Sequence, residues 1–290
     1  MTIETRALSA TDKDAVRAIS LSVWEHDYVP DIFLQWLEDP LWYPIGVFED
    51  NQLVSYLAIQ QVIDTSYAWV KALRTSKEHH GKGYAFKAIK HSITMSKELG
   101  INELRYSTSS RNQASMNLAI KAGFELIDTV GYVRIHKPYP AHPKSSSNFI
   151  PLIVDAIRVQ EVISQNPNLI ETSTIPSTWE FYNKDLNGLK KINEKSQLLL
   201  VIDEVGITQG LYFARKLGED GISIGAYSIY CQERATFVDI MSRILEELES
   251  DETDRSVFFL GPNATEWIKD MAILPEDWED RNFLLYKMQL

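Results

Sequence analysis

The first half of the chain changes repeatedly between helix-like and strand-like patterns of apolar residues. Apolar positions recur every three or four residues in four segments, which predicts helices over 11–24, 30–38, 84–99 and 112–122. Alternating or continuous apolar runs predict strands over 2–8, 45–48, 53–63, 67–75 and 103–109, with a terminal pair of strands around 125–136. This order of elements predicts an α/β (α+β) fold with a mixed sheet that is not doubly wound.

The second half repeats this coarse order after a segment that breaks both patterns. Strands are expected over 197–202, 211–215, 221–230, 256–260 and 283–288, and helices over 150–164 and 236–248. The segment 137–148 is dense in proline and serine, which is typical of a linker or of an ordered crossing segment. We therefore expect a first domain at 1–140, a linker at 141–150 and a second domain at 151–290. Trp267 and Trp278 are expected to be packing residues.

Composition and charge narrow the class of protein. A net charge of −11 disfavours nucleic acid or an anionic membrane as the main partner, because both require basic surfaces. The single Cys231 excludes an internal disulfide and suits a reducing, cytoplasmic location. No apolar stretch is long enough to span a bilayer, and the N-terminus lacks the apolar core of a signal peptide.

The most informative motif is His80-Gly81-Lys82-Gly83-Tyr84-Ala85, which lies between an expected strand and an expected helix. The first N–H groups of a helix have no partner within it, and the positive end of the helix dipole points the same way. Gly81 and Gly83 let the backbone approach an anion closely, and Lys82 adds a positive charge. The motif therefore predicts a turn that binds pyrophosphate, although an ordinary capped loop is compatible with it when it is taken alone. Its spacing fits neither a P-loop nor a Rossmann dinucleotide site.

A second motif supports the binding interpretation. The segment Asn112-Gln113-Ala114-Ser115-Met116-Asn117-Leu118-Ala119-Ile120-Lys121-Ala122-Gly123-Phe124 predicts a helix that is capped by its asparagine and ended by its glycine. Together the two motifs resemble the GNAT family of acyl-CoA N-acyltransferases. The first matches that family's [RQ]-x-x-G-x-[GA] loop, with histidine in place of arginine or glutamine, and the second matches its N-x-x-[AS]-x-x-L-x-x-K-x-G-F helix.

The resemblance implies a GNAT fold, acetyl-CoA as the donor and a set of residues that bind it. A backbone N–H near the end of the strand before the loop is expected to meet the thioester carbonyl. The cofactor-binding residues that it implies are Leu73, Arg74, Thr75, His80, Gly81, Lys82, Gly83, Tyr84, Ala85, Asn112 and Ser115. The second half resembles a degenerate GNAT-like domain, in tandem with the first, because the turn Cys231-Gln232-Glu233-Arg234 lacks the glycines. An unrelated α+β domain is the alternative.

Acyl transfer to an amine requires a neutral nucleophile, a polarised carbonyl and a proton for the leaving thiolate. The family's usual acid is a tyrosine at the position of Ala119, so Tyr106, Tyr132 or water must replace it. Lys71 stands where relatives often carry a carboxylate base, and Asp27 is a second candidate for that role, as is Glu25. Lysine acts as a base only when desolvation lowers its pKa.

Three short segments bear on the identity of the acceptor. Segments 24–30, 36–40 and 72–74 are similar to those of histidine N-acetyltransferases, which implies the α-amine of a free amino acid or a similar small amine. Arg74 or Lys71 would then meet the carboxylate of the acceptor, and an aromatic wall from Tyr28, Trp36 or Tyr56 would meet its side chain. Acetylation of protein N-termini or lysines and a regulator that binds coenzyme A without turnover are the alternatives.

Metal binding is not expected. His79 and His80 are adjacent and cannot share one face of a helix as ligands, and no carboxylate or cysteine nearby completes a zinc site.

Overall fold

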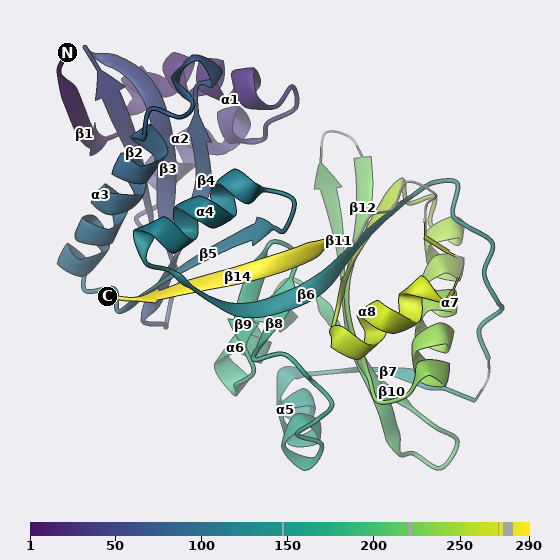
Figure 1. The fold of residues 1–290 in the computed structure, drawn as a ribbon. Coiled ribbons are helices and arrows are strands. Elements are labelled where there is room, and N and C mark those ends of the chain that lie inside the picture. Colours follow the sequence, from purple (N-terminus) through teal and green to yellow (C-terminus); the bar gives the residue numbers. More distant parts are fainter. Residues whose placement is uncertain (147, 220–221, 272, 275–280) are drawn as a thin grey trace. The chain divides into compact units, whose positions relative to one another are not determined.

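The computed structural model describes residues 1–146, 148–219, 222–271, 273–274 and 281–290 (Figure 1). The chain forms two compact units. The first unit contains Met1–Thr108, Asn112–Leu126 and Leu285–Leu290, and the second contains Ser109–Arg111 and Ile127–Leu284. These units differ from the linear split at 140 and 151 that the proline-rich segment suggests, because the C-terminal residues belong to the first unit.

The first unit is built on a mixed sheet. Its strands lie in the order β1 (Ile3–Ala7), β2 (Trp42–Glu49), β3 (Gln52–Gln61), β4 (Tyr67–Thr75), β5 (Glu103–Ser109) and β14 (Asn282–Gln289). The pairs from β1 to β4 are antiparallel, whereas β4 and β5 are parallel. The predicted mixed sheet is therefore confirmed. Consecutive residues of β2 and β3 are buried, so side chains on both faces of these strands are shielded from solvent. This explains why both strands have nearly continuous hydrophobic runs in the sequence.

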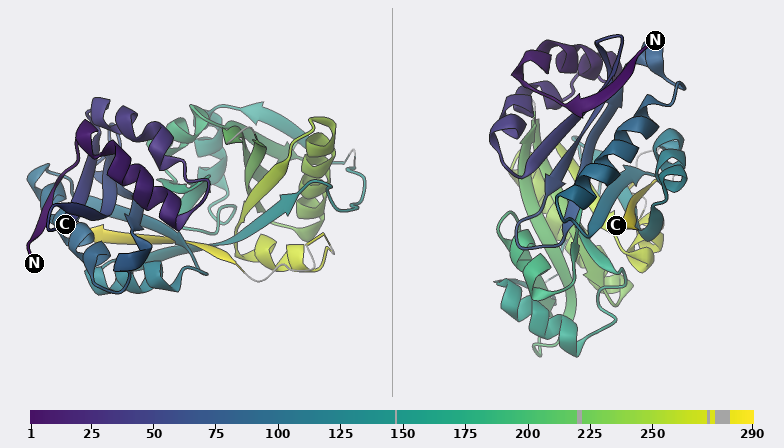
Figure 2. Two further views of the ribbon diagram at one scale, coloured as in Figure 1. Left: turned by 90° about the horizontal axis from the view of Figure 1, so that it is seen from above. Right: turned by 90° about the vertical axis from the view of Figure 1, so that its left-hand side faces the viewer.

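Helices cover both faces of this sheet. Figures 1 and 2 show α1 (Lys13–Val23) and α2 (Val29–Glu38) on one face, with α3 (Tyr84–Glu98) and α4 (Gln113–Ala122) on the other. Between the sheet and the first pair of helices lies an apolar core that includes Val16, Phe33, Trp36 and Tyr56. These residues are almost fully buried, so burial of apolar surface holds the two helices on the sheet.

The second unit also contains both parallel and antiparallel strand pairs. Its strands lie in the order β6 (Glu125–His136), β13 (Arg255–Leu260), β12 (Ile222–Cys231), β11 (Thr208–Glu219), β10 (Gln197–Ile202) and β7 (Ile150–Val154). Among the described residues of these strands, β12 and β13 pair in parallel, and the other neighbouring strands pair antiparallel. Four helices and a small hairpin complete the unit: α5 (Ala156–Gln165), α6 (Leu186–Asn193), α7 (Arg234–Ser250), α8 (Pro262–Lys269), β8 (Thr174–Ser177) and β9 (Glu180–Asn183).

Several expectations need correction. The segment expected to be one helix over 150–164 is strand β7 followed by α5, because Asp155 accepts a hydrogen bond from the backbone N–H of Arg158 and starts the helix there. The pair of strands expected around 125–136 is the single strand β6. Gly221 and Trp278 lie outside the described residues, and Trp267 packs against Phe237 as expected.

The described residues of the proline- and serine-rich segment make contacts within the second unit, as expected of an ordered crossing segment. Ser145 donates from its backbone N–H and its hydroxyl to Glu246 at 3.0 and 2.7 Å. Arg243 donates to the carbonyl oxygens of Ser146 and Phe149, each at 3.1 Å. Side chains of α7 therefore supply partners for backbone groups of this segment that strand pairing does not satisfy.

Candidate functional site

A cavity of about 460 Å³ lies within the first unit, at the carboxyl end of β4. Four parts of the unit form its wall: the end of α1, the end of β4 with the turn that follows, the first turn of α3, and β5 with α4. The lining residues are Val23, Trp24, Leu73, Arg74, Thr75, His79, His80, Gly81, Gly83, Tyr84, Ala85, Phe86, Tyr106, Asn112, Ala114, Ser115, Asn117, Leu118 and Lys121.

The turn between β4 and α3 has the geometry of an anion site. Gly81 and Gly83 have φ values of +76° and +84°, in the left-handed region that favours glycine. A Cβ at either position would meet no protein atom within 4 Å, so their backbone faces open space. Gly83 caps α3 without a side-chain hydrogen bond, which leaves the first N–H groups of the helix available to a ligand.

Neighbouring side chains stabilise this turn. His80 Nε2 lies 2.9 Å from the carbonyl oxygen of Thr75. The hydroxyl of Tyr84 donates to Glu49, and this hydrogen bond raises the pKa of Tyr84 to about 12. His79 also lies 3.3 Å from Glu49, so Glu49 anchors both ends of the turn. Tyr84 therefore offers its backbone to the cavity, while its hydroxyl is engaged elsewhere.

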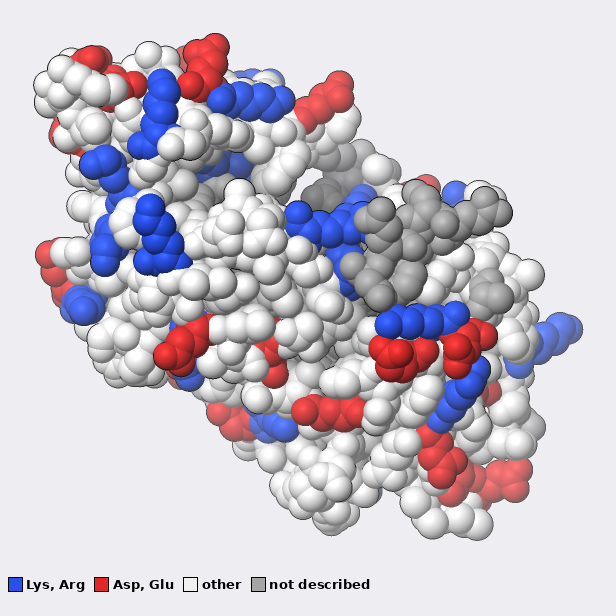
Figure 3. Space-filling view, viewed as in Figure 1, with Lys and Arg blue, Asp and Glu red and all other residues white. Residues whose placement is uncertain are grey.

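Positive charge gathers near this turn although the chain as a whole is acidic. Helix α3 carries Lys87 and Lys90 in its first two turns, and Lys82 is exposed in the turn before it. Figure 3 shows Lys and Arg side chains clustered over α3. Lys121 of α4 lines the cavity and lies 4.8 Å from the ring of Phe86. The surroundings of the turn are therefore locally suited to a phosphate-bearing ligand.

A β-bulge shapes the strand that enters the site. The register passes from Tyr56–Arg74 to Ala58–Lys71, so Ala72 and Leu73 of β4 oppose one residue of β3. Ala72 has a φ of +52°, which is unusual for a residue with a side chain. A bulge takes backbone groups out of the ladder, and here it does so beside the cavity.

Tyr106 and Ser115 form the wall opposite the turn. The two hydroxyls are hydrogen-bonded to each other, and Tyr106 is only 7% exposed. Burial raises the pKa of Tyr106 above its ordinary value, so the phenol keeps its proton. Asn112 Oδ1 accepts from the backbone N–H of Ser115 at 3.0 Å, which caps α4 and fixes the serine.

Asp27 and Arg74 form a buried ion pair at the edge of the cavity. Arg74 Nε and Nη2 donate to the two carboxylate oxygens of Asp27 at 2.8 and 3.1 Å. The guanidinium also lies 3.9 Å from the centroid of the Trp24 ring. Asp27, expected as a base, and Arg74, expected to bind an acceptor carboxylate, are therefore each other's partners.

The remaining candidates lie outside the cavity wall. Trp36 is a core residue, 3% exposed and stacked on Trp42 at 4.8 Å, so it is not an acceptor wall as expected. Tyr56 is fully buried, and its hydroxyl lies 2.5 Å from that of Ser20. Lys71 lies 5.2 Å from the ring of Trp69, and neither it nor the half-exposed Tyr28 lines the cavity.

Sequence reasoning did not assign roles to several lining residues. Phe86, Leu118 and Lys121 lie on the two motif helices. Their distance along the sequence from Gly83 and Asn112 could have indicated that they face the same cavity. Trp24 begins the segment 24–30 that the acceptor resemblance singled out, but it was given no role of its own, because only the fold brings the end of α1 beside β4.

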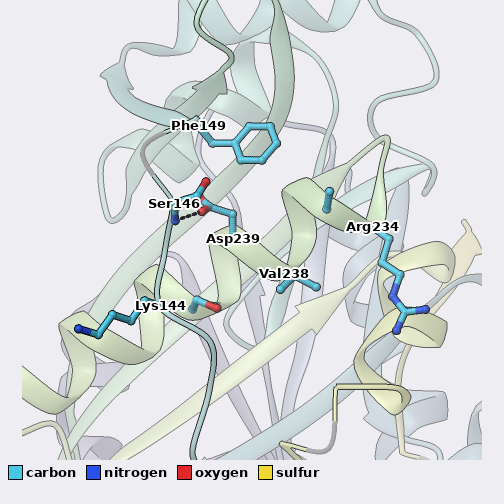
Figure 4. Close-up of a pocket in the computed structure, with 8 residues that line it drawn as sticks. Lys144, Ser146, Phe149, Arg234, Val238 and Asp239 are labelled. Atoms are coloured by element: carbon cyan, nitrogen blue, oxygen red, sulfur yellow. Dashed lines mark hydrogen bonds between the residues drawn. The ribbon is translucent and has the colours of Figure 1, made fainter.

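A second cavity of about 500 Å³ lies in the second unit, against α7 (Figure 4). Asp239 accepts from the backbone N–H of Ser146 at 2.5 Å, and Arg234 pairs with Asp270 at 3.1 Å. Figure 4 shows Lys144 and Arg234 pointing away from each other on opposite sides of Val238. Its charged side chains therefore do not converge on a common point.

Within the described ranges, no group of three or more histidine, cysteine, aspartate or glutamate side chains is placed to hold a metal ion. No helix among the described residues is long and apolar enough to cross a membrane.

Comparison with known proteins finds a family that part of the first unit resembles. Residues 10–124 match the model of the acetyltransferase (GNAT) family. A search of curated proteins finds no match. The matched residues contain the whole turn, the bulge and the Tyr106–Ser115 pair, so this part of the first unit is similar to acetyltransferases of the GNAT family.

Solved structures extend the likeness of fold over the whole chain. A tandem GNAT protein from the clavulanic acid biosynthesis pathway has a TM-score of 0.58 at 11% identity, with 99% of this chain and 98% of that chain covered. A GCN5-related N-acetyltransferase from Sphaerobacter thermophilus has a TM-score of 0.63 at 9% identity, with 99% and 95% covered. A Thermoplasma acidophilum protein, provisionally assigned as an acetyltransferase, has a TM-score of 0.63 at 13% identity, with 99% and 100% covered. The predicted tandem GNAT fold is confirmed.

Proposed function

We propose that the first unit transfers an acetyl group from acetyl-CoA to the primary amine of a small molecule. One observation carries this proposal: a single cavity is lined by the glycine turn, the β4 bulge and the Tyr106–Ser115 pair. These parts correspond to the needs of acyl transfer, which are an anchor for the donor, a polar backbone near the carbonyl and a proton donor.

The residues present fit acetyl-CoA. Open space beside Gly81 and Gly83 and the uncapped start of α3 suit its pyrophosphate. The donor supplies an activated thioester, whose thiolate leaves more readily than an alkoxide. Tyr106 holds a proton at its hydroxyl because burial raises its pKa, and Ser115 orients that hydroxyl. The backbone of Leu73 and Thr75, beside the bulge, is the candidate partner for the carbonyl.

The chemistry of the cavity favours an α-amine acceptor. None of its nineteen described lining residues is a carboxylate, so a strongly basic amine finds no carboxylate there to deprotonate it. An α-amine is less basic than the side-chain amine of lysine, so a larger fraction of it is neutral at pH 7. We therefore propose the α-amine of a free amino acid, histidine-like acceptors first, as the substrate class. Because Asp27 holds Arg74, Arg74 is not the group proposed to bind the acceptor carboxylate.

Release of free coenzyme A tests this function. Purified protein is given acetyl-CoA with a panel of amino acids, polyamines and lysine peptides, and the free thiol is followed. We expect turnover with one or more amino acids, and a mass increase of one acetyl group on the product. Turnover with lysine peptides or polyamines alone would disprove the acceptor class.

A regulator that binds coenzyme A without turnover is the second candidate. The absence of a tyrosine at Ala119 favours it, because Ala119 is buried and offers no proton. Isothermal titration with coenzyme A separates the two functions. Tight binding without thiol release from any acceptor in the panel would favour the regulator.

A further inference from the structure

The ion pair between Asp27 and Arg74 is unusual in how completely both charges are withdrawn from solvent. The side chain of Asp27 is 0% exposed and that of Arg74 is 8% exposed. The pair is bidentate, and Asp27 Oδ1 also accepts from the backbone N–H of Val29 at 3.3 Å. Asp27 is therefore fixed both by the guanidinium and by the start of α2.

Arg74 passes this constraint to the bulge. Its third guanidinium nitrogen, Nη1, donates to the carbonyl oxygen of Leu73 at 3.1 Å. Leu73 is one of the two residues that make the bulge, and its carbonyl belongs to the peptide that joins it to Arg74. Because a peptide is planar, holding the carbonyl also sets the direction of the N–H on the other side of the same plane. The bulge is thus held by a side chain as well as by the strand ladder.

The same guanidinium positions part of the cavity wall. The Trp24 ring stacks over it at 3.9 Å, although Trp24 itself is half-exposed and follows the last turn of α1. Stacking on a guanidinium that is already immobilised costs little further order. One carboxylate therefore holds together three features of the site: the start of α2, the bulge and Trp24.

We propose that Asp27 is a positioning residue and not the base of the reaction. Through Arg74 it fixes the bulge at Leu73, whose backbone is a candidate partner for the thioester carbonyl of the donor under the proposed function, on which this inference rests. Arg74, in turn, is a positioning residue and not a receptor for the acceptor's carboxylate.

Arg74→Lys tests the proposal because it keeps the charge next to Asp27 but loses the planar fork. A lysine has one nitrogen and cannot bind both oxygens of Asp27 and the carbonyl of Leu73 in this geometry. We expect kcat to fall about 100-fold, the effect of misplacing reacting groups by an ångström. KM for acetyl-CoA should change little, because the glycine turn is untouched. Asp27→Asn should lower kcat similarly, and the pH profile of kcat should keep its wild-type shape in both variants.

Arg6→Lys is the matched control. Arg6 makes the same kind of bidentate pair with Asp12, at 2.8 and 2.9 Å, and its Nη1 donates to the carbonyl oxygen of Ala7 at 2.9 Å. It also stacks on the ring of Phe48 at 3.9 Å, but none of these residues lines the cavity. We expect Arg6→Lys to keep wild-type kcat. An equal loss of kcat in both lysine variants would reduce the Asp27 pair to a stability role and overturn the proposal.

The opposite assignment of Asp27 gives a different pattern. If Asp27 were the base, Asp27→Asn would remove the acidic limb of the pH profile, whereas Arg74→Lys would keep most of the activity. That result would also overturn the proposal.

A spectroscopic readout separates this inference from the proposed function. Acetyl-CoA labelled with ¹³C at the carbonyl is bound to each variant, and the carbonyl chemical shift is measured without an acceptor. We expect a displaced shift in the wild type and in Arg6→Lys, and a shift close to that of free acetyl-CoA in Arg74→Lys. The same shift in wild type and Arg74→Lys would overturn the positioning role alone. Failure of the wild type to bind acetyl-CoA would overturn both proposals.

Discussion

Gly83 combines two properties that a single substitution can separate. Its φ of +84° strains any residue with a Cβ, and the space beside it is open. Under the proposed function that space belongs to the pyrophosphate. We expect Gly83→Val to raise KM for acetyl-CoA more than tenfold, because its side chain occupies the approach of the phosphate, with a loss of stability of about 1–3 kcal/mol. Initial rates at varied acetyl-CoA and a thermal melt measure the two effects.

Gly206 provides the control for strain. Its φ is +85°, and a Cβ there also meets nothing within 4 Å, but it lies in the turn between β10 and β11 of the second unit. Gly206→Val should lose similar stability and keep the wild-type KM. If Gly83→Val shows no larger change in KM than Gly206→Val, the turn does not bind the donor.

The hydroxyl of Tyr106 is the proposed proton donor to the leaving thiolate. Burial raises its pKa, so the phenol stays protonated through neutral pH and is lost as a donor only above its ordinary value of about 10. We expect Tyr106→Phe to lower kcat about 10–100-fold with little change in KM, since general acid catalysis contributes on that scale. Wild-type kcat should show no alkaline fall below about pH 10 from this group. An unchanged kcat in Tyr106→Phe would leave water as the proton donor.

At the scale of residues, local motifs contain most of the proposed donor site, whereas they do not specify the contacts on the acceptor side. The two glycines, Asn112 and Ser115 lie within short motifs, and the structure brings them to one cavity. The Asp27–Arg74 pair joins residues 47 positions apart, and no local pattern specifies that contact. Trp36 is of a residue type that often binds ligands, but it stacks on Trp42 and belongs to the core.

At the scale of elements, α4 depends on one capping residue that also serves the site. Asn112 caps the helix through the N–H of Ser115, and Ser115 orients Tyr106. We expect Asn112→Ala to lose about 1 kcal/mol of stability and, because the serine becomes less fixed, to lower kcat as well. Thermal melts and initial rates measure both.

Asp155→Ala is the control for the cap alone. Asp155 caps α5 in the same way, through the N–H of Arg158 at 2.8 Å, and none of these residues lines the cavity. It should lose similar stability without a change in kcat. Equal rates in the two variants would show that the cap of α4 is purely structural.

Long elements with a clear period could be predicted, whereas short ones could not. The ranges of α3, β4 and α7 lie within a few residues of their expected positions. The apolar run at β7 looked like the start of a helix because its strand character comes from pairing with β10, which is distant in sequence. The hairpin β8–β9 and the helices α6 and α8 are short, and tertiary packing outweighs their weak local pattern.

At the scale of the whole molecule, the first unit is discontinuous in sequence. Its last segment, Leu285–Leu290, comes from the C-terminus. Lys287 pairs with Glu103 at 2.6 Å, and the backbone N–H of Leu290 donates to the carbonyl oxygen of Asn102 at 2.9 Å. Sequence patterns predicted this strand, but they did not predict that it belongs to the first unit. The order of strands in a sheet is not encoded locally.

This discontinuity predicts that the first unit does not fold properly when the chain ends at residue 140. Leu285 and Tyr286 are 1% and 2% exposed, and losing the burial of one such side chain costs about 1.5–3 kcal/mol. The truncated chain also leaves β5 as an open edge, which invites aggregation. We expect residues 1–140 to melt at a lower temperature than the full chain and to bind coenzyme A weakly. A synthetic peptide of residues 282–290 should restore binding in titration calorimetry, and the same peptide with Tyr286→Asp should not. Tight binding by residues 1–140 alone would show that the C-terminal strand is dispensable and that the domain is continuous after all.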